Sequence, residues 1–150
     1  MMPIPKAPLF LSLAGLLPFL WGALTYLNAD LAAWGAARLG PRFIGPYVQL
    51  FYGSVILSFM SGILWGFATK ATGGKAATAY VLAVIPAIWA FVMTGGGPVS
   101  AGSNLIFGFA GVLLLDSAFT AWHLAPPWWM RLRVPMTIAV IACLSVGVWL

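Results

Sequence analysis

Five apolar segments, each long enough to cross a lipid bilayer as a helix, occupy most of this 150-residue sequence. A bilayer core of about 30 Å needs roughly 20 apolar residues at 1.5 Å per residue. Open β-sheets cannot span a bilayer, because lipid offers no hydrogen-bond partner to the amides at their edges. These segments are also too long and too uniformly apolar to be strands of a β-barrel. The predicted spans are residues 9–27, 46–68, 76–93, 101–122 and 134–150. The sequence therefore predicts an all-α, polytopic transmembrane bundle that forms one domain over residues 1–150.

Charged residues are too few for a water-soluble fold. Only 6% of the residues are charged, against roughly 25% in soluble domains, and 63% are apolar. A soluble chain of this size leaves a large surface in water and needs polar residues to cover it. This composition therefore disfavours soluble enzymes, nucleic-acid-binding modules and disordered tails, and it favours an integral membrane protein. The net charge of +5 comes from basic residues between the spans, where they flank a membrane and do not form a nucleic-acid-binding face.

The basic residues predict the orientation of the chain in the membrane. Five spans place the two termini on opposite sides. The side of the N-terminus holds five basic residues, Lys6, Lys70, Lys75, Arg131 and Arg133, and the other side holds Arg38 and Arg42. Loops rich in Lys and Arg remain in the cytoplasm. We therefore expect a multi-pass protein of the bacterial inner membrane, with a cytoplasmic N-terminus and a periplasmic C-terminus.

The connection between the first two spans is long for a simple turn. It begins with Asn28 and Asp30, residue types that cap helix N-termini, and continues with a mostly apolar stretch. This pattern predicts a short helix over residues 30–39 that lies in the membrane interface, with Trp34 at headgroup depth and Arg38 facing lipid phosphates. An ordered loop is the alternative.

Small residues recur every four positions in the second span, at Ser54, Ser58, Gly62 and Gly66. In lipid, a stripe of small residues lets two helix backbones approach closely. We expect this stripe to pack against another helix of the same bundle. A homodimer face and a ligand slot are the alternatives.

Asp116 is the one acidic residue inside a predicted span. A carboxylate at the centre of a membrane helix costs about 2.5–3.5 kcal/mol of insertion free energy, so it needs a compensating partner. Arg131 and Arg133 follow on the same side of the membrane and have long, flexible side chains. We predict an intramembrane ion pair between Asp116 and Arg131 or Arg133. The alternative makes Asp116 a proton or cation site.

The segment between the fourth and fifth spans has the composition that is typical of protein segments at a membrane surface. Pro126 and Pro127 end the fourth helix, and Trp128 and Trp129 follow directly. Tryptophan is enriched at membrane interfaces. Trp128 and Trp129, together with Trp34, are therefore predicted interface anchors, with membrane lipids as their partners.

No combination of residues indicates catalysis or cofactor binding. The sequence has one histidine and one cysteine, which is too few for a zinc site or a haem held by two histidines. Ligation of a haem by His123 and a methionine lacks a supporting spacing. No glycine-rich phosphate loop, Ser-His-Asp set or pair of carboxylates is present. We predict a protein that is not an enzyme, with no catalytic, cofactor-binding or metal-binding residues.

Two stretches resemble a family of small, functionally uncharacterised inner-membrane proteins that includes mitochondrial transmembrane protein 69. The first is Tyr52–Gly66, and the second is Leu115-Asp116 followed by Pro127–Thr137. The family usually has Gly at the position of Ser61 and often a polar residue at that of Leu64. The resemblance implies five spans in an energy-coupling membrane and no assigned catalytic residues.

These observations favour a non-catalytic accessory or assembly subunit. Its partners would be other integral membrane subunits of a respiratory or photosynthetic complex, because almost no part of the chain lies outside the membrane. The alternative function is that of a small transporter or a quinone- or lipid-binding protein that uses a cavity near Asp116.

Overall fold

The computed structural model describes residues 3–150, and over those residues the chain is helical, as predicted. The elements are α1 (Lys6–Gly15), α2 (Leu17–Leu27), α3 (Ala29–Leu39), the 3-10 turn η1 (Pro41–Phe43), α4 (Gly45–Ala68), α5 (Gly74–Met93), α6 (Pro98–Ala121) and α7 (Trp129–Trp149). Five stretches of the described chain are long and apolar enough to cross a membrane: Lys6–Leu27 and the helices α4 to α7. The chain is an integral, multi-pass membrane protein.

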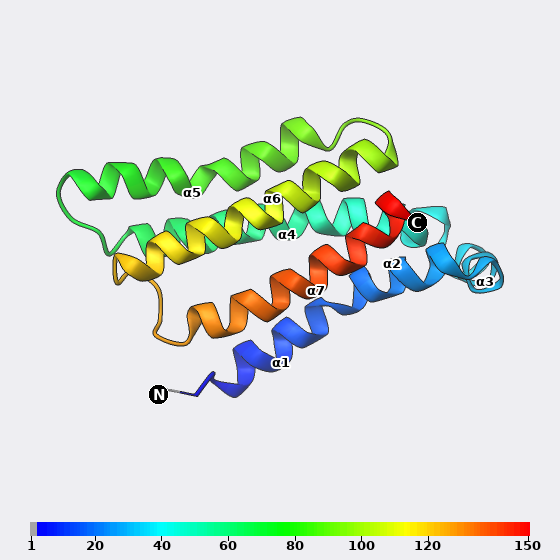
Figure 1. Ribbon diagram of the computed structural model, residues 1–150, viewed down its shortest axis with the longest axis horizontal. Helices are drawn as coiled ribbons and strands as arrows, with labels where there is room; N and C mark the ends of the chain where they lie inside the picture. Colours follow the sequence, from blue (N-terminus) through cyan, green and yellow to red (C-terminus); the bar gives the residue numbers. More distant parts are fainter. Residues whose placement is uncertain (1–2) are drawn as a thin grey trace.

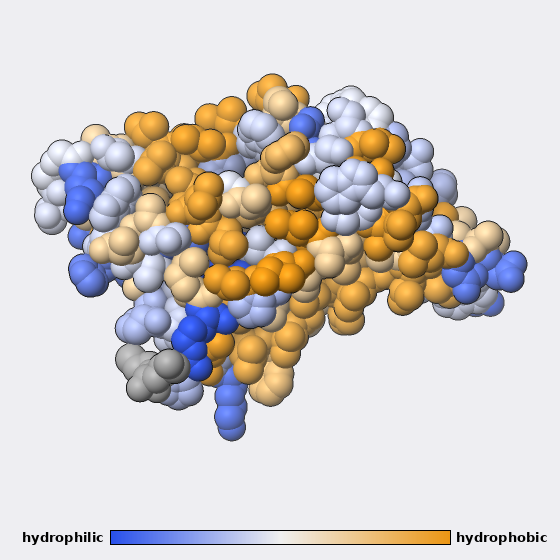
Figure 2. Space-filling view, in the orientation of Figure 1, coloured by the Kyte–Doolittle hydropathy of each residue, from blue (hydrophilic) through white to orange (hydrophobic). Residues whose placement is uncertain are grey.

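The long helices run side by side, with the start of α1 and the end of α7 at opposite ends of the bundle (Figure 1). Helix α4 lies at the centre and contacts α2, α5 and α6, while α7 packs against α6 and α2. Hydrophobic residues cover the middle of the bundle surface, and hydrophilic residues gather mainly toward its two ends (Figure 2). An apolar band between two polar ends is the surface that a bilayer requires.

The first span is a bent pair of helices, α1 and α2. Pro18 lacks the N–H that would bond the carbonyl of Ala14, and a proline of this kind bends a helix at the preceding turn. The break falls at Leu16, whose N–H donates to the Leu13 carbonyl at 3.1 Å. Because of this bend, the axes of α1 and α2 point in different directions.

A helix occupies the connection that follows the first span. The side chain of Asn28 caps α3 and accepts a hydrogen bond from the Leu31 N–H at 3.0 Å. Gly40, at φ 93°, ends the helix in a conformation that favours glycine. In Figure 1, α3 is seen almost end-on, across the direction of the long helices. A helix at the end of the bundle with this direction suits the plane of a membrane interface.

A proline inside α5 is accommodated by a serine of α4. Pro86 disturbs the helical hydrogen bonds around it, and in membranes Ser and Thr side chains commonly satisfy the amides that are released. Here the N–H of Ala87 donates to the hydroxyl oxygen of Ser61 at 2.7 Å. This hydrogen bond joins the two helices at the middle of their contact.

The last helix begins earlier than the predicted fifth span. Helix α7 starts at Trp129, whereas the sequence indicated residue 134. The sequence indicates a surface turn over residues 125–133, because this segment contains two prolines, two tryptophans and two arginines. From Trp129 onward this segment is helical, and the side chains of Trp129 and Arg133 bond to Asp116.

Candidate functional site

Asp116 lies completely buried in α6, with 0% of its surface exposed. One carboxylate oxygen accepts a hydrogen bond from the indole N–H of Trp129 at 2.9 Å. The other accepts one from Nε of Arg133, also at 2.9 Å, which forms an ion pair. Both oxygens are thus bound by the first turns of α7. The charge is compensated inside the bundle and joins α6 to α7.

The two partners of Asp116 reach it because they are four residues apart on one helix. Residues at i and i+4 lie on the same face, one turn apart. The ring of Phe67, from the end of α4, packs edge-on against the indole of Trp129 with centroids 5.1 Å apart. The Asp116 cluster, defined as Asp116, Trp129 and Arg133, is therefore enclosed by α4, α6 and α7.

Two polar atoms beside this cluster have no hydrogen-bond partner among the described residues. They are Nη2 of Arg133 and the hydroxyl oxygen of Thr137, one turn further along α7. A buried donor or acceptor without a partner costs about 1–3 kcal/mol of folding free energy. The Asp116 cluster is consequently balanced in charge but retains unused hydrogen-bonding capacity.

The predicted ion pair forms with Arg133. Arg131 and Arg133 are separated by one residue on α7, so they point in different directions. Arg133 is the one that faces α6. The side chain of Arg133 is 11% exposed. Arg131 lies on the exposed side of the helix.

The assignment of Trp129 as an interface anchor is wrong. Its side chain is only 7% exposed and donates its N–H to Asp116. The sequence places two tryptophans next to each other, and the helical rotation of about 100° per residue sends them in different directions. Trp128 is half-buried, and Trp34 on α3 is 53% exposed beneath the guanidinium of Arg38, 5.4 Å from its ring.

The predicted packing stripe on the second span is also wrong. Ser58, Gly62 and Gly66 are exposed, and a side chain added at either glycine would meet nothing within 4 Å. Ser54 is half-buried and donates to the Leu50 carbonyl at 2.8 Å. A strict four-residue repeat rotates by about 40° at each step, so this stripe crosses the helix surface and moves outward.

The face of α4 that packs into the bundle is the neighbouring one. Its residues follow one another in steps of three and four, which keeps them on one side of the helix. They are Gly53, Leu57, Met60, Leu64 and Ala68. The inward face therefore combines large apolar side chains with small residues at its two ends.

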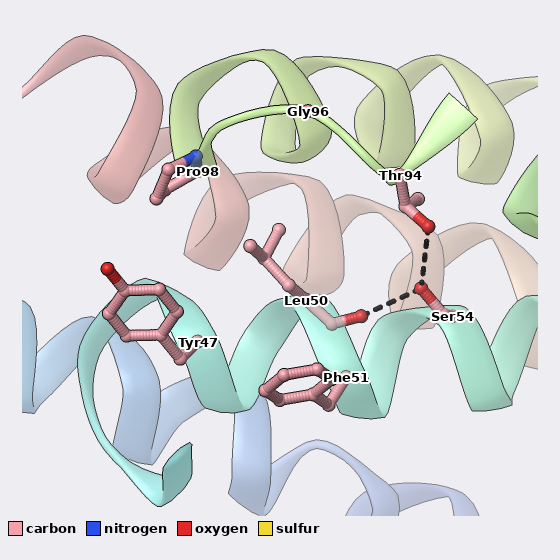
Figure 3. Close-up of a pocket in the computed structure, with 7 residues that line it drawn as sticks. All are labelled: Tyr47, Leu50, Phe51, Ser54, Thr94, Gly96 and Pro98. Carbon is pink, nitrogen blue, oxygen red and sulfur yellow. Dashed lines mark hydrogen bonds between the residues drawn. The ribbon is translucent and has the colours of Figure 1, made fainter. Parts of the chain in front are cut away.

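A small cavity of about 270 Å³ lies between the first turns of α4 and the loop after α5. Figure 3 shows Ser54 and Thr94 turned toward each other on one side of it, with Tyr47 and Pro98 on the other. Both hydroxyl groups also donate to carbonyls of their own helices, Ser54 to Leu50 and Thr94 to Ala90. These hydrogen bonds leave the two hydroxyl groups little free capacity to bind a ligand.

A larger cavity of about 350 Å³ lies between α1, α4 and α7. Its lining includes Arg133 and Trp129, so it borders the Asp116 cluster, although Asp116 itself does not line it. Among the described residues, no group of three or more His, Cys, Asp or Glu side chains could hold a metal ion.

Gln49 forms a second buried polar cluster that was not predicted. Its side chain is 2% exposed, and its amide nitrogen donates to the carbonyl of Phe19 at 2.9 Å and to that of Cys143 at 3.1 Å. One side chain thus joins α2, α4 and α7. Both acceptors are backbone carbonyls far away in the sequence. Every residue has such a carbonyl, so the residue types at these positions do not predict the contacts.

Comparisons with known proteins agree that this chain is a membrane protein. A family model described as "Protein of unknown function (DUF3429)" matches residues 4–149. Transmembrane protein 69 of Xenopus tropicalis is 28% identical over 141 residues, which are 91% of this chain and 51% of the relative. The chain therefore spans about half the length of the curated relative that it matches. No solved structure matches it.

Proposed function

Because this chain belongs to the DUF3429 family, whose function is unknown, we propose a function from the geometry of its helices. The protein is a non-catalytic accessory or assembly subunit that packs, within the bilayer, against a larger respiratory or photosynthetic complex. Its membrane is the bacterial inner membrane, with the N-terminus in the cytoplasm and the C-terminus in the periplasm.

The observation that carries this proposal is the closure of the Asp116 cluster. The carboxylate is the one acidic group inside a span, and Trp129 and Arg133 occupy both of its oxygens. A proton or cation site would need an approach from water or from a substrate, and Asp116 is 0% exposed. The charge therefore serves to hold helices together. This supports a role in assembly more than one in chemistry.

The outward stripe on α4 supports contact with another membrane protein. Ser58, Gly62 and Gly66 are exposed on the outer side of α4, and their small size leaves room there for another helix. Helix association in lipid relies on close packing because lipid tails are as apolar as the side chains. We place a helix of the partner subunit on this surface.

The test is a purification from native membranes in mild detergent. Gly62→Leu should reduce recovery of a stoichiometric partner by about fivefold or more, since the added side chain blocks close packing. Leucine is also the better helix former, so the bundle itself stays folded. Ala142→Leu, at an exposed position on α7, is the matched control and should retain the partner. A wild-type protein that purifies alone would contradict the accessory function.

The orientation needs a separate measurement. Lys75 lies in the first turn of α5, directly after the loop that follows α4, at the end of the bundle to which the sequence assigns most of the basic residues. A cysteine at this position should react with an impermeant thiol reagent only after the cell is opened. Labelling of Lys75→Cys in intact spheroplasts from the outer side would reverse the proposed topology.

A second candidate function is the binding of a quinone or lipid, or its transport. One observation favours it: the cavity between α1, α4 and α7 borders the Asp116 cluster and has Arg133 in its wall. A structural ion pair alone does not require such a cavity.

A further inference from the structure

The cavity between α1, α4 and α7 has the dimensions of a ligand site. Its volume is about 350 Å³, and ligand pockets of this size are typically apolar with a few polar groups. The lining extends from Tyr52 to Ile63 on α4 and from Trp129 to Val140 on α7, which is about 16 Å along each helix. Four aromatic rings and two thioethers line it: Phe19, Tyr52, Phe59, Trp129, Met60 and Met136.

The cavity opens beside α1, a helix that makes few contacts with the rest of the bundle. No residue of α1 is buried. Leu11 of α1 and Phe59 of α4 line the cavity and are 73% and 63% exposed. These two side chains form its rim on the lipid-facing surface. A molecule dissolved in the bilayer can therefore enter between α1 and α4 without crossing water.

Hydrogen-bond donors lie in this otherwise apolar wall. The guanidinium of Arg133 has five N–H donors, and its bond from Nε to Asp116 uses one of them. Tyr52 adds a phenolic hydroxyl, which lies 3.5 Å from the position of a side chain at Gly15 in the bend of the first span. The wall thus offers donors to a ligand that carries acceptor oxygens.

The charge balance selects a neutral ligand. Asp116 already neutralises Arg133 at 2.9 Å and is completely buried. An anionic headgroup would compete for Arg133 and leave a buried carboxylate without its partner, which is strongly unfavourable. A neutral carbonyl can accept a hydrogen bond from Arg133 while the ion pair stays intact. Flat aromatic walls and thioethers further favour a planar ring over a flexible glycerol ester.

We propose that this cavity binds the ring of a lipophilic quinone, with a quinone carbonyl accepting a hydrogen bond from Arg133. The apolar tail leaves between Leu11 and Phe59 into the bilayer. Tyr52, Phe59 and Trp129 contact the ring or the first part of the tail. This inference rests on the second candidate function and gives it a ligand class and a site.

The experiment uses the full chain in phosphatidylcholine vesicles with two photoreactive probes, an azidoquinone and a diazirine-bearing diacylglycerol. Leu11→Trp fills the rim of the cavity without touching the ion pair, and its matched control is Leu13→Trp, an exposed position of α1 that does not line the cavity. The azidoquinone should label cavity-lining peptides of α1, α4 and α7. Leu11→Trp should lower that labelling at least about tenfold, while Leu13→Trp leaves it unchanged. Excess decylubiquinone should compete, and phosphatidylglycerol should not.

The two probes separate the ligand from the function. If the diacylglycerol labels the cavity in a Leu11-dependent way and the azidoquinone does not, the quinone assignment is wrong and lipid binding stands. If neither probe depends on Leu11, the cavity is not a binding site and the second candidate function falls with it. Competition by phosphatidylglycerol would overturn the argument from charge balance.

Discussion

The Gln49 cluster and the Asp116 cluster are both buried and polar, and they stabilise the bundle in different ways. The Gln49 cluster joins α2, α4 and α7 through a neutral amide that donates to two backbone carbonyls. The Asp116 cluster joins α6 and α7 through a full charge on each side, and it leaves Nη2 of Arg133 without a partner. The neutral cluster uses both N–H groups of its amide. The charged one borders a cavity that Arg133 and Trp129 help to line, so it is the one that can combine structure with binding.

The largest difference should appear when one charge is removed. Arg133→Met leaves the carboxylate of Asp116 buried without a cation, and we expect a loss of about 3–5 kcal/mol in unfolding free energy. The double variant Asp116→Leu with Arg133→Met removes both charges and should recover most of this loss, because apolar replacements of buried ion pairs are often tolerated. Reversible unfolding in mixed detergent micelles measures both. Equal stability of the single and double variants would show that the charges are not coupled.

Asp116→Asn makes the charged cluster resemble the neutral one. Asparagine keeps an acceptor for Trp129 or Arg133 but removes the negative charge, and a hydrogen bond to a charged group contributes about 1.5–3 kcal/mol. We expect a loss in this range with the folded bundle retained. If the variant instead keeps full stability and loses a measurable transport activity, Asp116 is a proton or cation site.

The sequence predicted the charged cluster because charge in a membrane span is rare and must be compensated. Asp116 and an arginine partner followed from that requirement alone. Gln49 could not be found in this way, since an uncharged polar residue in a span is common and its partners are main-chain atoms 30 and 94 residues away. The positions of the helices were also largely predictable from length and hydropathy, but the break between α1 and α2 and the early start of α7 were not.

The directions of side chains were harder to predict than the helices themselves. The repeat of Ser58, Gly62 and Gly66 is conspicuous in the sequence, yet it lies on the side of α4 that the neighbouring helices leave exposed. Trp129 has the residue type of an interface anchor, yet its N–H is required by a carboxylate on another helix. Both errors have one physical origin: neighbouring helices decide which face is buried, and a single sequence does not contain their positions.

The neutral cluster should be sensitive to crowding. A side chain at Gly22 of α2 would collide with the side chain of Gln49 and lie 2.9 Å from the carbonyl oxygen of Gly45. Forcing extra volume into a packed interior costs about 1–3 kcal/mol, and we expect Gly22→Ala to lose roughly 2 kcal/mol. The control is Gly62→Ala on the open face of the same bundle, which should gain up to about 1 kcal/mol from helix propensity. Similar results at the two glycines would mean that α2 and α4 are not in close contact.

The smallest effect is expected when the amide of Gln49 is removed without changing its size much. Gln49→Leu deletes the hydrogen bonds to Phe19 and Cys143, but no charge is left behind and both carbonyls remain available to their own helices. Interhelical hydrogen bonds in membranes average about 0.6 kcal/mol, so the two bonds together should contribute roughly 1 kcal/mol. Unfolding in the same mixed micelles measures this loss against that of Arg133→Met. A loss of unfolding free energy as large as that of Arg133→Met would mean that the neutral cluster contributes as much to the stability of the bundle as the charged one.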